Sequence, residues 1–391
     1  MKEFELIAPC HFGMEAILKR EINDLGLSIV SVEDGRITFR GDESAVCRAN
    51  IFLRTAERVL IKAASFKAVT YDELFEGVKA VRWEEFIPEN GKFWVTKASG
   101  IKSKLFSPSD IQSIVKKAIV EELKGVYKRS WFEESGDPYP LRVTIMKDIV
   151  TIGLDTTGES LHKRGYRKLV SRAPVSENLA AAMIMLSPWK ADRILVDPFC
   201  GCGTIPIEAA MIAAKIAPGL NRSFTAENWT NIIEKKNWYR AAEEADSLIN
   251  MDIEAEIIGY DIDGDIIAAA RENARMADVE KLIRFKKQPV SELEHRGKYG
   301  FIITNPPYGE RVGDKEALPA LYKELSEGIK RLDSWSAFII TGFEDVEKYM
   351  GRKADRNRKV YNGMMKTYIY QFMGKPPGKM PVGGLKHPEN T

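Results

Sequence analysis

Hydrophobic and polar residues follow two periods along this chain, and the two periods divide it into strands and helices. A period of two marks strands over residues 4–7, 27–32 and 36–39, and the last two flank Asp34-Gly35, a pair typical of tight hairpins. A helical period runs from Gly13 to Gly26, and a short helix is expected over 47–53. Residues 1–57 are therefore predicted to form a small α/β unit.

A second unit is predicted over residues 58–160. Its expected strands are 59–69, 92–98, 141–145 and 149–154, and its expected helices are 70–81 and 109–127. The last two strands flank Lys147-Asp148, which predicts a hairpin.

The third region, residues 161–374, alternates strands with helices. The expected helices are 173–186, 205–217, 266–277 and 317–332, and the expected strands are 193–196, 255–261, 283–287, 300–304 and 336–341. Such repeated units predict a parallel, doubly wound sheet. Residues 358–361 and 366–373 are expected to add an edge hairpin, and residues 375–391, rich in Pro, Gly and Lys, to form a flexible tail.

Composition narrows the class of protein. The chain has 391 residues, of which 44% are hydrophobic and 29% charged, which favours a globular protein of two or three domains. We expect a cytoplasmic protein without a membrane span, because no apolar run has the needed length and residues 1–13 lack the apolar core of a secretory signal. Only Cys200 and Cys202 of the four cysteines are close in sequence, with no histidine nearby, so no metal site is expected.

The charge is unevenly distributed along the chain. The formal net charge is only +2, but residues 58–172 hold 21 Lys+Arg against 15 Asp+Glu, a local charge of +6 that leaves −4 for the remainder. Most single lysines at such positions are simply solvated, but the asymmetry as a whole indicates a polyanionic partner. The candidate contacts to this polyanion, all within this basic region, are Lys97, Lys102, Lys104, Lys163, Arg164 and Arg167.

A glycine-rich turn follows the first strand of the predicted parallel sheet. Residues 197–204 (Asp-Pro-Phe-Cys-Gly-Cys-Gly-Thr) connect that strand to a helix, and Gly201 and Gly203 allow a ligand to approach the backbone closely. No Gly-Lys-Ser/Thr follows, which disfavours ATP hydrolysis, and Asp197 is foreign to the dinucleotide fingerprint. Asp261 ends the next strand, where a carboxylate can bind both hydroxyls of a ribose.

The most specific pattern is Asn305-Pro306-Pro307-Tyr308, directly after the strand 300–304. The prolines fix the backbone, so the Asn305 amide oxygen and the Pro306 carbonyl can accept hydrogen bonds from an exocyclic amino group. Tyr308 offers a flat face for a base. An ordinary turn that ends a strand would explain the Asn-Pro pair, but not the aromatic residue after the second proline.

These three segments together resemble the class I S-adenosylmethionine-dependent methyltransferases that modify an exocyclic amino nitrogen of a base. The resemblance implies a Rossmann-like domain with a mostly parallel seven-stranded sheet. It also implies that Asn305, Pro306 and Tyr308 are catalytic, and that the cofactor contacts are Asn178, Asp197, Phe199, Gly201, Gly203, Thr204 and Asp261. The family usually has an acid after its third strand, near the cofactor adenine, where this chain has Pro289.

The N-terminal half, with residues 161–167 (Leu-His-Lys-Arg-Gly-Tyr-Arg), resembles THUMP-containing RNA methyltransferases, in particular the group that methylates guanine N2 in 23S rRNA. The resemblance implies a ferredoxin-like order of elements over residues 1–57, and the implied substrate is 23S rRNA or a ribosome assembly intermediate. N6-adenine methylation of RNA or DNA and a non-catalytic RNA-binding role remain the alternatives. A nicotinamide-dependent dehydrogenase is disfavoured, because its fingerprint is missing.

Overall fold

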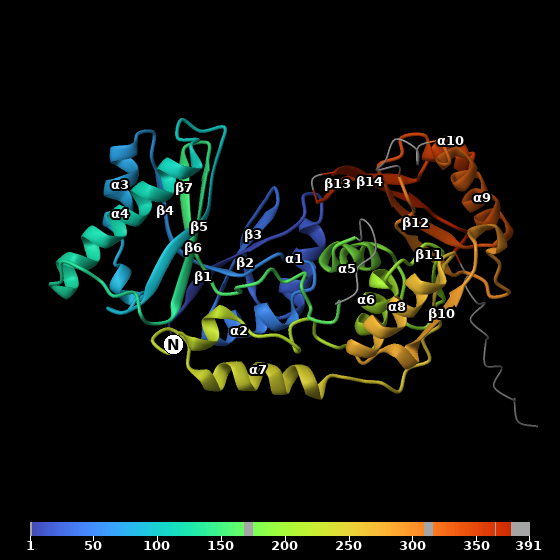
Figure 1. The fold of residues 1–391 in the computed structure, drawn as a ribbon, viewed down its shortest axis with the longest axis horizontal. Coiled ribbons are helices and arrows are strands. Elements are labelled where there is room, and N and C mark those ends of the chain that lie inside the picture. The colour runs from blue at the N-terminus through green and yellow to red at the C-terminus, as the bar shows by residue number, and fades with distance from the viewer. Residues whose placement is uncertain (1, 168–174, 309–315, 364, 377–391) are drawn as a thin grey trace, which may run out of the picture.

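The computed structural model describes residues 2–167, 175–308, 316–363 and 365–376, and this part of the chain contains two seven-stranded sheets. The sheets lie side by side along the long axis of the molecule (Figure 1). The N-terminal half forms one of them and the C-terminal half the other.

The first sheet has the order β2-β3-β1-β4-β7-β6-β5. Its strands are β1 (Phe4–Pro9), β2 (Ser28–Glu33), β3 (Arg36–Gly41), β4 (Leu60–Lys67), β5 (Lys92–Ile101), β6 (Pro138–Met146) and β7 (Ile149–Asp155), and the accompanying helices are α1 (Glu15–Asp24), α2 (Glu43–Phe52), α3 (Tyr71–Lys79), η1 (Trp83–Glu85) and α4 (Pro108–Tyr127). The two units predicted separately are thus joined, because β1 of the first pairs with β4 of the second.

Local sequence explains where several of these helices begin. Asp42 caps α2 by accepting a hydrogen bond from the Ala45 amide. Thr70 and Glu73 form a reciprocal capping box at the start of α3. Each such cap contributes about 1 kcal/mol. Pro108 starts α4, where a missing amide proton costs nothing.

The second sheet has the order β10-β9-β8-β11-β12-β14-β13. Its strands are β8 (Leu195–Asp197), β9 (Ile257–Asp261), β10 (Ile283–Lys287), β11 (Phe301–Thr304), β12 (Ser336–Thr341), β13 (Arg356–Asn362) and β14 (Met365–Phe372). The connecting helices are α5 (Glu177–Leu186), α6 (Thr204–Ala213), η2 (Thr225–Asn228), α7 (Lys235–Ser247), α8 (Gly264–Met276), η3 (Glu280–Leu282), η4 (Val290–Glu292), α9 (Leu318–Arg331) and α10 (Val346–Met350). Strands β10, β9, β8, β11 and β12 are parallel, whereas β14 runs antiparallel between β12 and β13.

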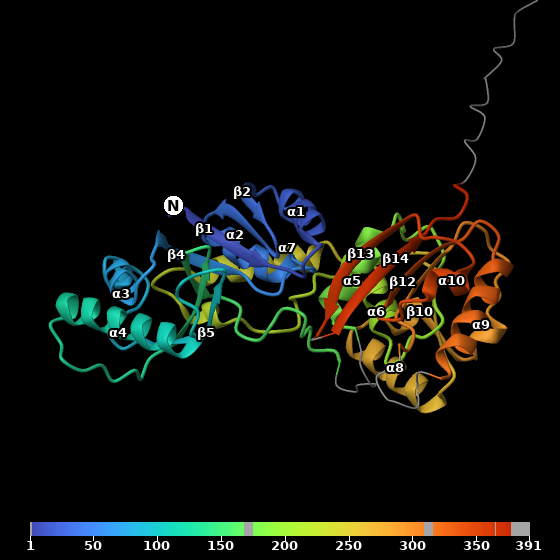
Figure 2. The ribbon, with the colours of Figure 1, turned by 90° about the horizontal axis from the view of Figure 1, so that it is seen from above.

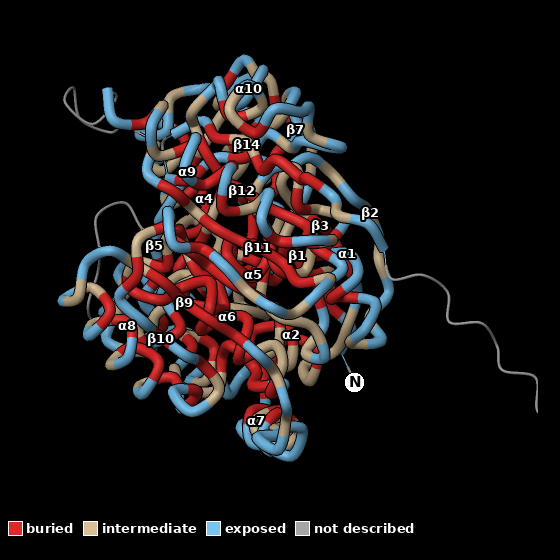
Figure 3. The backbone as a smooth tube through the Cα atoms, turned by 90° about the vertical axis from the view of Figure 1, so that its right-hand side faces the viewer, coloured by how far each residue is buried: buried red, intermediate tan, exposed pale blue. Residues whose placement is uncertain are grey.

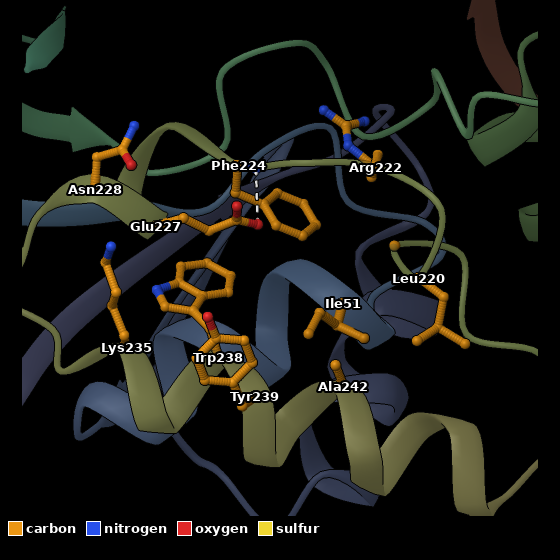
Figure 4. Close-up of a pocket in the computed structure, with 11 residues that line it drawn as sticks. Ile51, Leu220, Arg222, Phe224, Glu227, Asn228, Lys235, Trp238, Tyr239 and Ala242 are labelled. Atoms are coloured by element: carbon orange, nitrogen blue, oxygen red, sulfur yellow. Dashed lines mark hydrogen bonds between the residues drawn. The ribbon is translucent and has the colours of Figure 1, made fainter.

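The segment between α6 and β9 leaves the second sheet and packs on the first half of the molecule (Figure 2). Helix α7 lies against α2, and Arg48 of α2 makes a bidentate ion pair with Glu244 of α7. A cavity of about 280 Å³ remains between α2, η2 and α7, with the stacked rings of Phe224 and Trp238 at its wall (Figure 4). The buried apolar side chains from Phe224 to Ala245 therefore belong to the N-terminal core, whereas those at the two ends of the segment pack on the second sheet.

Several details differ from the sequence-based expectations. Helices α7 and α10 were not predicted, and helix α2 begins at Glu43 rather than at residue 47. Helix α5 begins at Glu177 because Ser176 has an extended backbone, and residues 173 and 174 of the predicted helix lie outside the described residues. Helix α6 ends at Ala213 rather than Ala217, because Lys215 adopts a positive φ of 56°.

Burial follows the sheets, with the buried residues inside and exposed ones on the outer helices and loops (Figure 3). The second sheet buries both faces, since separate apolar clusters cover its two sides. None of the described helices has the length and apolarity required to cross a membrane.

Candidate active site

The carboxyl ends of β8, β9 and β11 bring the predicted site residues together. Strand β8 lies between β9 and β11, so Asp197, Asp261 and Asn305 follow neighbouring strands at one edge of the sheet. The Thr304 hydroxyl donates to the Asp197 carboxylate at 2.6 Å, and the Phe199 amide donates to the same oxygen at 3.1 Å. Asp197 is thereby fixed at the centre of the site, and Thr304, not predicted from the sequence, is the residue that holds it.

The turn from β8 to α6 is shaped by its glycines. Gly201 and Gly203 have φ values of 51° and 89°, a conformation that strains residues with a Cβ. A Cβ on Gly203 would lie 3.1 Å from Phe285 and 3.2 Å from Ala270. The turn is therefore closely packed against β10 and α8 at Gly203, whereas Gly201 is partly exposed.

Asp261 connects this turn to β9. Its carboxylate accepts hydrogen bonds from the Gly201 amide at 3.1 Å and from the Asp263 amide at 3.0 Å. Burial raises the pKa of Asp261, and the two amides oppose this effect. The carboxylate remains partly exposed, as a group that binds a ribose requires.

Asp197 differs from Asp261 in being almost completely buried. Burial raises its pKa to about 7, the hydrogen bonds from Thr304 and Phe199 lower it, and Asp261 raises it further. A ligand that carries positive charge near the turn would lower both pKa values and favour the ionised carboxylates.

The segment after β11 has an unsatisfied acceptor. The Asn305 side-chain oxygen is buried and has no hydrogen-bond partner among the described residues. The neighbouring backbone is held in place, because the Tyr322 hydroxyl donates to the Pro307 carbonyl at 3.3 Å. The Tyr308 hydroxyl accepts from the Asn362 side-chain amide at 3.0 Å, which fixes the ring. A ligand that donates a hydrogen bond would satisfy Asn305.

This donor set fits a nucleoside-containing cofactor beside a base. The partly exposed backbone at Gly201 can contact a ligand, and the partly exposed Asp261 fits a ribose. The Asn305 oxygen, which has no partner in the described part of the chain, fits an amino group next to the cofactor. The order of the sheet, with one antiparallel strand between β12 and β13, is that of the expected Rossmann-like fold.

Comparison with known families assigns the chain to a methyltransferase family. The family described as RMKL-like, methyltransferase domain, matches residues 164–371, more than half of the chain. The chain belongs to this methyltransferase family. The RlmL ferredoxin-like domain matches residues 5–60 and the THUMP domain matches residues 68–155, which confirms the predicted fold class and the family resemblance.

The chain is similar to one curated relative of about its own length and to another that is about twice as long. "Putative RNA methyltransferase YpsC" of Bacillus subtilis (strain 168) is 46% identical over 96% of this chain and 97% of its own length. The "Ribosomal RNA large subunit methyltransferase K/L" of Cellvibrio japonicus (strain Ueda107) is 32% identical over 94% of this chain and 51% of its own length. The chain therefore spans about half the length of that K/L relative.

Solved structures of the same architecture are also similar. A possible methylase from Clostridium difficile 630 has a TM-score of 0.93 at 49% identity, covering 97% of this chain and all of that one. A predicted N6-adenine-specific DNA methylase from Listeria monocytogenes str. 4b F2365 has a TM-score of 0.90 at 44% identity, covering 96% and 97%. The protein SMU.472, complexed with SAH, has a TM-score of 0.89 at 42% identity, covering 96% and 100%.

Within this methyltransferase fold, Asn178 lies on the buried side of α5. Its side-chain oxygen is 3.2 Å from the His11 imidazole, which belongs to the loop after β1. The first helix of the methyltransferase domain thus contacts the ferredoxin-like domain next to the predicted cofactor pocket. His11 was not predicted, and no local pattern marks it, because its partner is 167 residues away in sequence.

Four of the six predicted RNA-binding side chains are exposed. Lys97 lies on β5, and Lys102 and Lys104 lie on the loop after it. This loop is held by a hydrogen bond from the Lys104 amide to the Asp148 side chain at 2.8 Å. Lys163 lies on the connection to the methyltransferase domain, with its side chain 60% exposed.

The structure contradicts the RNA-binding prediction for Arg164. Its side chain is 1% exposed and pairs with Glu208 at 3.4 Å, while its other nitrogens donate to the carbonyls of Leu161 and Arg54. A guanidinium so enclosed joins the domains and cannot reach a phosphate. Arg167 is also largely paired, since it contacts Glu177 at 3.0 Å and the Thr204 hydroxyl at 3.4 Å.

The region around Pro289 departs from the usual family pattern. The Gln288 amide donates to the Asp261 carbonyl at 2.8 Å, and its side chain bonds the Glu292 carbonyl and the Lys286 ammonium. Gln288 is therefore committed to the loop itself and does not replace the family acid with its side chain.

Proposed function

We propose that this chain transfers a methyl group from S-adenosylmethionine to an exocyclic amino nitrogen of an RNA base, N2 of a guanine in 23S rRNA. The substrate is 23S rRNA or a ribosome assembly intermediate, and the reaction takes place in the cytoplasm. The observation that carries the proposal is the buried side-chain oxygen of Asn305, directly after β11, which has no hydrogen-bond partner among the residues that the structure describes.

S-adenosylmethionine, when bound, supplies an electrophilic methyl group on a sulfonium. Asp197, the turn around Gly201 and Gly203, and Asp261 would hold it at the ends of β8 and β9. Support comes from SMU.472, which was crystallised with SAH, the product left when that methyl group departs.

The amino nitrogen of a base is a weak nucleophile, because its lone pair is conjugated with the ring. Hydrogen bonds accepted by the Asn305 oxygen and the Pro306 carbonyl would favour a pyramidal nitrogen with its lone pair directed at the methyl group. Tyr308, held by Asn362, offers a surface for the base, which must leave its stack to enter the site. No strong general base is needed for these steps.

RNA is favoured over DNA by the THUMP match and by the relatives named as RNA or ribosomal RNA methyltransferases. The +6 charge of residues 58–172 supports a polyanion as partner. The choice of guanine N2 as the methylated atom depends on the resemblance in architecture to the K/L relatives. The chain covers about half the length of the Cellvibrio relative.

Replacing Asn305 with Ala tests the catalytic proposal. We expect methyl incorporation into RNA to fall at least about a hundredfold, because an oriented hydrogen-bonding group at the reacting centre is lost. Cofactor affinity, measured by calorimetry, should stay within about twofold of the original value. The matched control is Asn357→Ala, an exposed asparagine on β13. Methylation by the Asn305→Ala protein at the original rate would contradict the proposal.

N6-adenine methylation is the second candidate, because a pair of carbonyl acceptors after β11 suits either exocyclic amine. The Listeria relative is described as a predicted N6-adenine-specific DNA methylase. Mass spectrometry of nucleosides from a strain lacking this protein separates the two. Loss of N2-methylguanosine from one 23S rRNA position supports our assignment, whereas loss of N6-methyladenosine overturns it. A purified protein that binds RNA but not the cofactor would be a non-catalytic RNA-binding protein.

A further inference from the structure

A cleft of about 760 Å³ lies where the ferredoxin-like and methyltransferase domains meet. Residues 10–12, in the loop after β1, line one part of it, and Tyr361 and Asn362, at the end of β13, line another. Asn178 and His162 also line it. Among the described residues, the lining includes none of the glycine turn 197–203, but it does include Asn178, a predicted cofactor contact, so the cleft adjoins the predicted cofactor site.

The cleft is continuous with the candidate base-binding residues. Asn362 lines the cleft and donates its side-chain amide to the Tyr308 hydroxyl. On the other side, His11 lines the cleft and contacts Asn178 at 3.2 Å and the Ser176 hydroxyl at 3.4 Å. A strand of RNA whose target base contacts Tyr308 would have its neighbouring nucleotides at this cleft.

The loop that forms the N-terminal wall is fixed against the methyltransferase domain. The Arg358 guanidinium donates to the Gly13 carbonyl at 2.8 Å. Gly13 has a φ of 85°, and a Cβ there would lie 3.2 Å from the Lys359 carbonyl. The cleft is thus a defined cavity between two docked elements.

The residues that line the cleft favour binding of a flat, neutral group over a phosphate. Phe12 and Tyr361 both line the cleft and are 49% and 41% exposed. The charged side chains of the lining are Arg167, which is paired with Glu177, and the acidic Glu57. Burial and the nearby Arg167 lower the pKa of His162 to about 4, so it is uncharged at neutral pH. Aromatic faces without net positive charge favour a nucleobase over a backbone phosphate.

We infer that this cleft binds an unpaired nucleotide next to the methylated one, with its base stacked on Phe12 or Tyr361. The inference rests on the proposed function for the identity of the nucleic acid. Extrusion of the target base leaves its neighbour without a stacking partner, and an aromatic side chain replaces that partner. The ferredoxin-like domain thus contributes a side chain, Phe12, to substrate positioning.

The inference is tested with Phe12→Ala and Tyr361→Ala. One probe is a single-stranded RNA of about 12 nucleotides with a central 2-aminopurine, whose fluorescence is quenched when it stacks. The other is the KM for transcribed 23S rRNA. We expect weaker quenching and a KM raised about tenfold in at least one variant, with kcat and calorimetric cofactor affinity unchanged. Phe12→Trp should restore the quenching, and Tyr239→Ala, an exposed aromatic on α7, is the control.

The outcomes separate this inference from the proposed function. Variants that methylate RNA with an unchanged KM and quench the probe like the original protein would overturn the inference while the function stands. Quenching that depends on Phe12 or Tyr361, in a protein that methylates no RNA, would support the cleft and overturn the function. An original protein that does not quench the probe would also overturn the inference.

Discussion

Asp197 has a different electrostatic environment from an ordinary carboxylate, because it is buried beside a second acid. Its pKa of about 7, against 3.8 in water, means that the folded protein holds a proton that the unfolded chain has released. Between about pH 4 and pH 7 the native state therefore binds more protons than the unfolded state. Raising the pH through this window must lower the free energy of unfolding.

Asp197→Asn should weaken this pH dependence. The contribution of Asp197 is at most about 1.4 kcal/mol per pH unit, so the loss of stability between pH 5 and pH 7 should shrink by about 2 kcal/mol in the variant. Asparagine keeps an oxygen that can accept from Thr304 and Phe199. Urea unfolding at the two pH values measures the effect. Asp252→Asn, an exposed acid, is the control. Equal pH slopes for Asp197→Asn and the original protein would contradict the assigned pKa.

In residues 161–167, two neighbouring cationic side chains, Lys163 and Arg164, have different environments. Lys163 is exposed, whereas Arg164 is enclosed between the domains and pairs with Glu208. The two are equivalent in charge and in local sequence pattern. Which one faces solvent depends on the position of α6, which carries Glu208, and that position is set by the packing of the whole domain.

At the scale of elements, the turn between β8 and α6 shows how backbone conformation makes a site. Gly203 precedes the first residue of α6 with a positive φ, and its missing side chain leaves room for Phe285, Ala270 and Ile207. The glycine thus serves both the sharp turn and the packing of the turn on neighbouring elements.

Gly203→Ala should weaken cofactor binding by at least about tenfold and lower stability by about 1–2 kcal/mol, because an alanine is strained at this φ and its Cβ has no space. Calorimetry and thermal unfolding measure the two effects. Gly26→Ala is the matched control, since Gly26 also has a positive φ of 74° but nothing within 4 Å of the added Cβ. It should lose similar stability with unchanged cofactor affinity. If Gly203→Ala binds the cofactor as the original protein does, the turn is not the contact that we propose.

Helix α7 illustrates what periodicity does not reveal. Its buried residues, Trp238, Ala241 and Ala245, lie at helical spacing. The helix nevertheless falls outside the alternation of strands and helices that marks the second sheet, because no strand stands between α6 and α7 in this fully described stretch of the chain. The helix covers the N-terminal core rather than the sheet on either side of it in sequence. Its location could be found only from the tertiary structure.

At the scale of the whole molecule, the exposed lysines and the active site lie on different sheets. Lys102 and Lys104 follow β5, at the edge of the first sheet, whereas Asn305 follows β11 in the second (Figure 1). The two halves are joined by Arg164–Glu208, Arg48–Glu244 and the hydrogen bond from Arg358 to Gly13. A nucleic acid bound at the lysines would therefore be held at a fixed distance from the residues that we propose to be catalytic.

The double substitution of Lys102 and Lys104 by Ala should weaken RNA binding without changing kcat. If each lysine contacts one phosphate of an unpaired strand, the slope of log K against log salt concentration should decrease in magnitude by about 1.4. Binding titrations at several salt concentrations measure this slope. Lys348→Ala with Lys353→Ala, two exposed lysines near α10, is the control. An unchanged slope would remove Lys102 and Lys104 from the RNA-binding surface.

Most of the strand and helix order, the three segments of the candidate site and the family resemblance could be predicted from the sequence, because periodicity, glycine turns and Asn-Pro-Pro-Tyr are local patterns with local physical causes. The predicted roles of Asp261 and Asn305 followed from their places at strand ends, and that of Asp197 from the family resemblance. Tertiary structure decided which basic residues are exposed, that α7 covers the N-terminal core, and that His11 and Asn362 meet the site from distant segments. These features depend on contacts between residues far apart in sequence, and no local pattern encodes them.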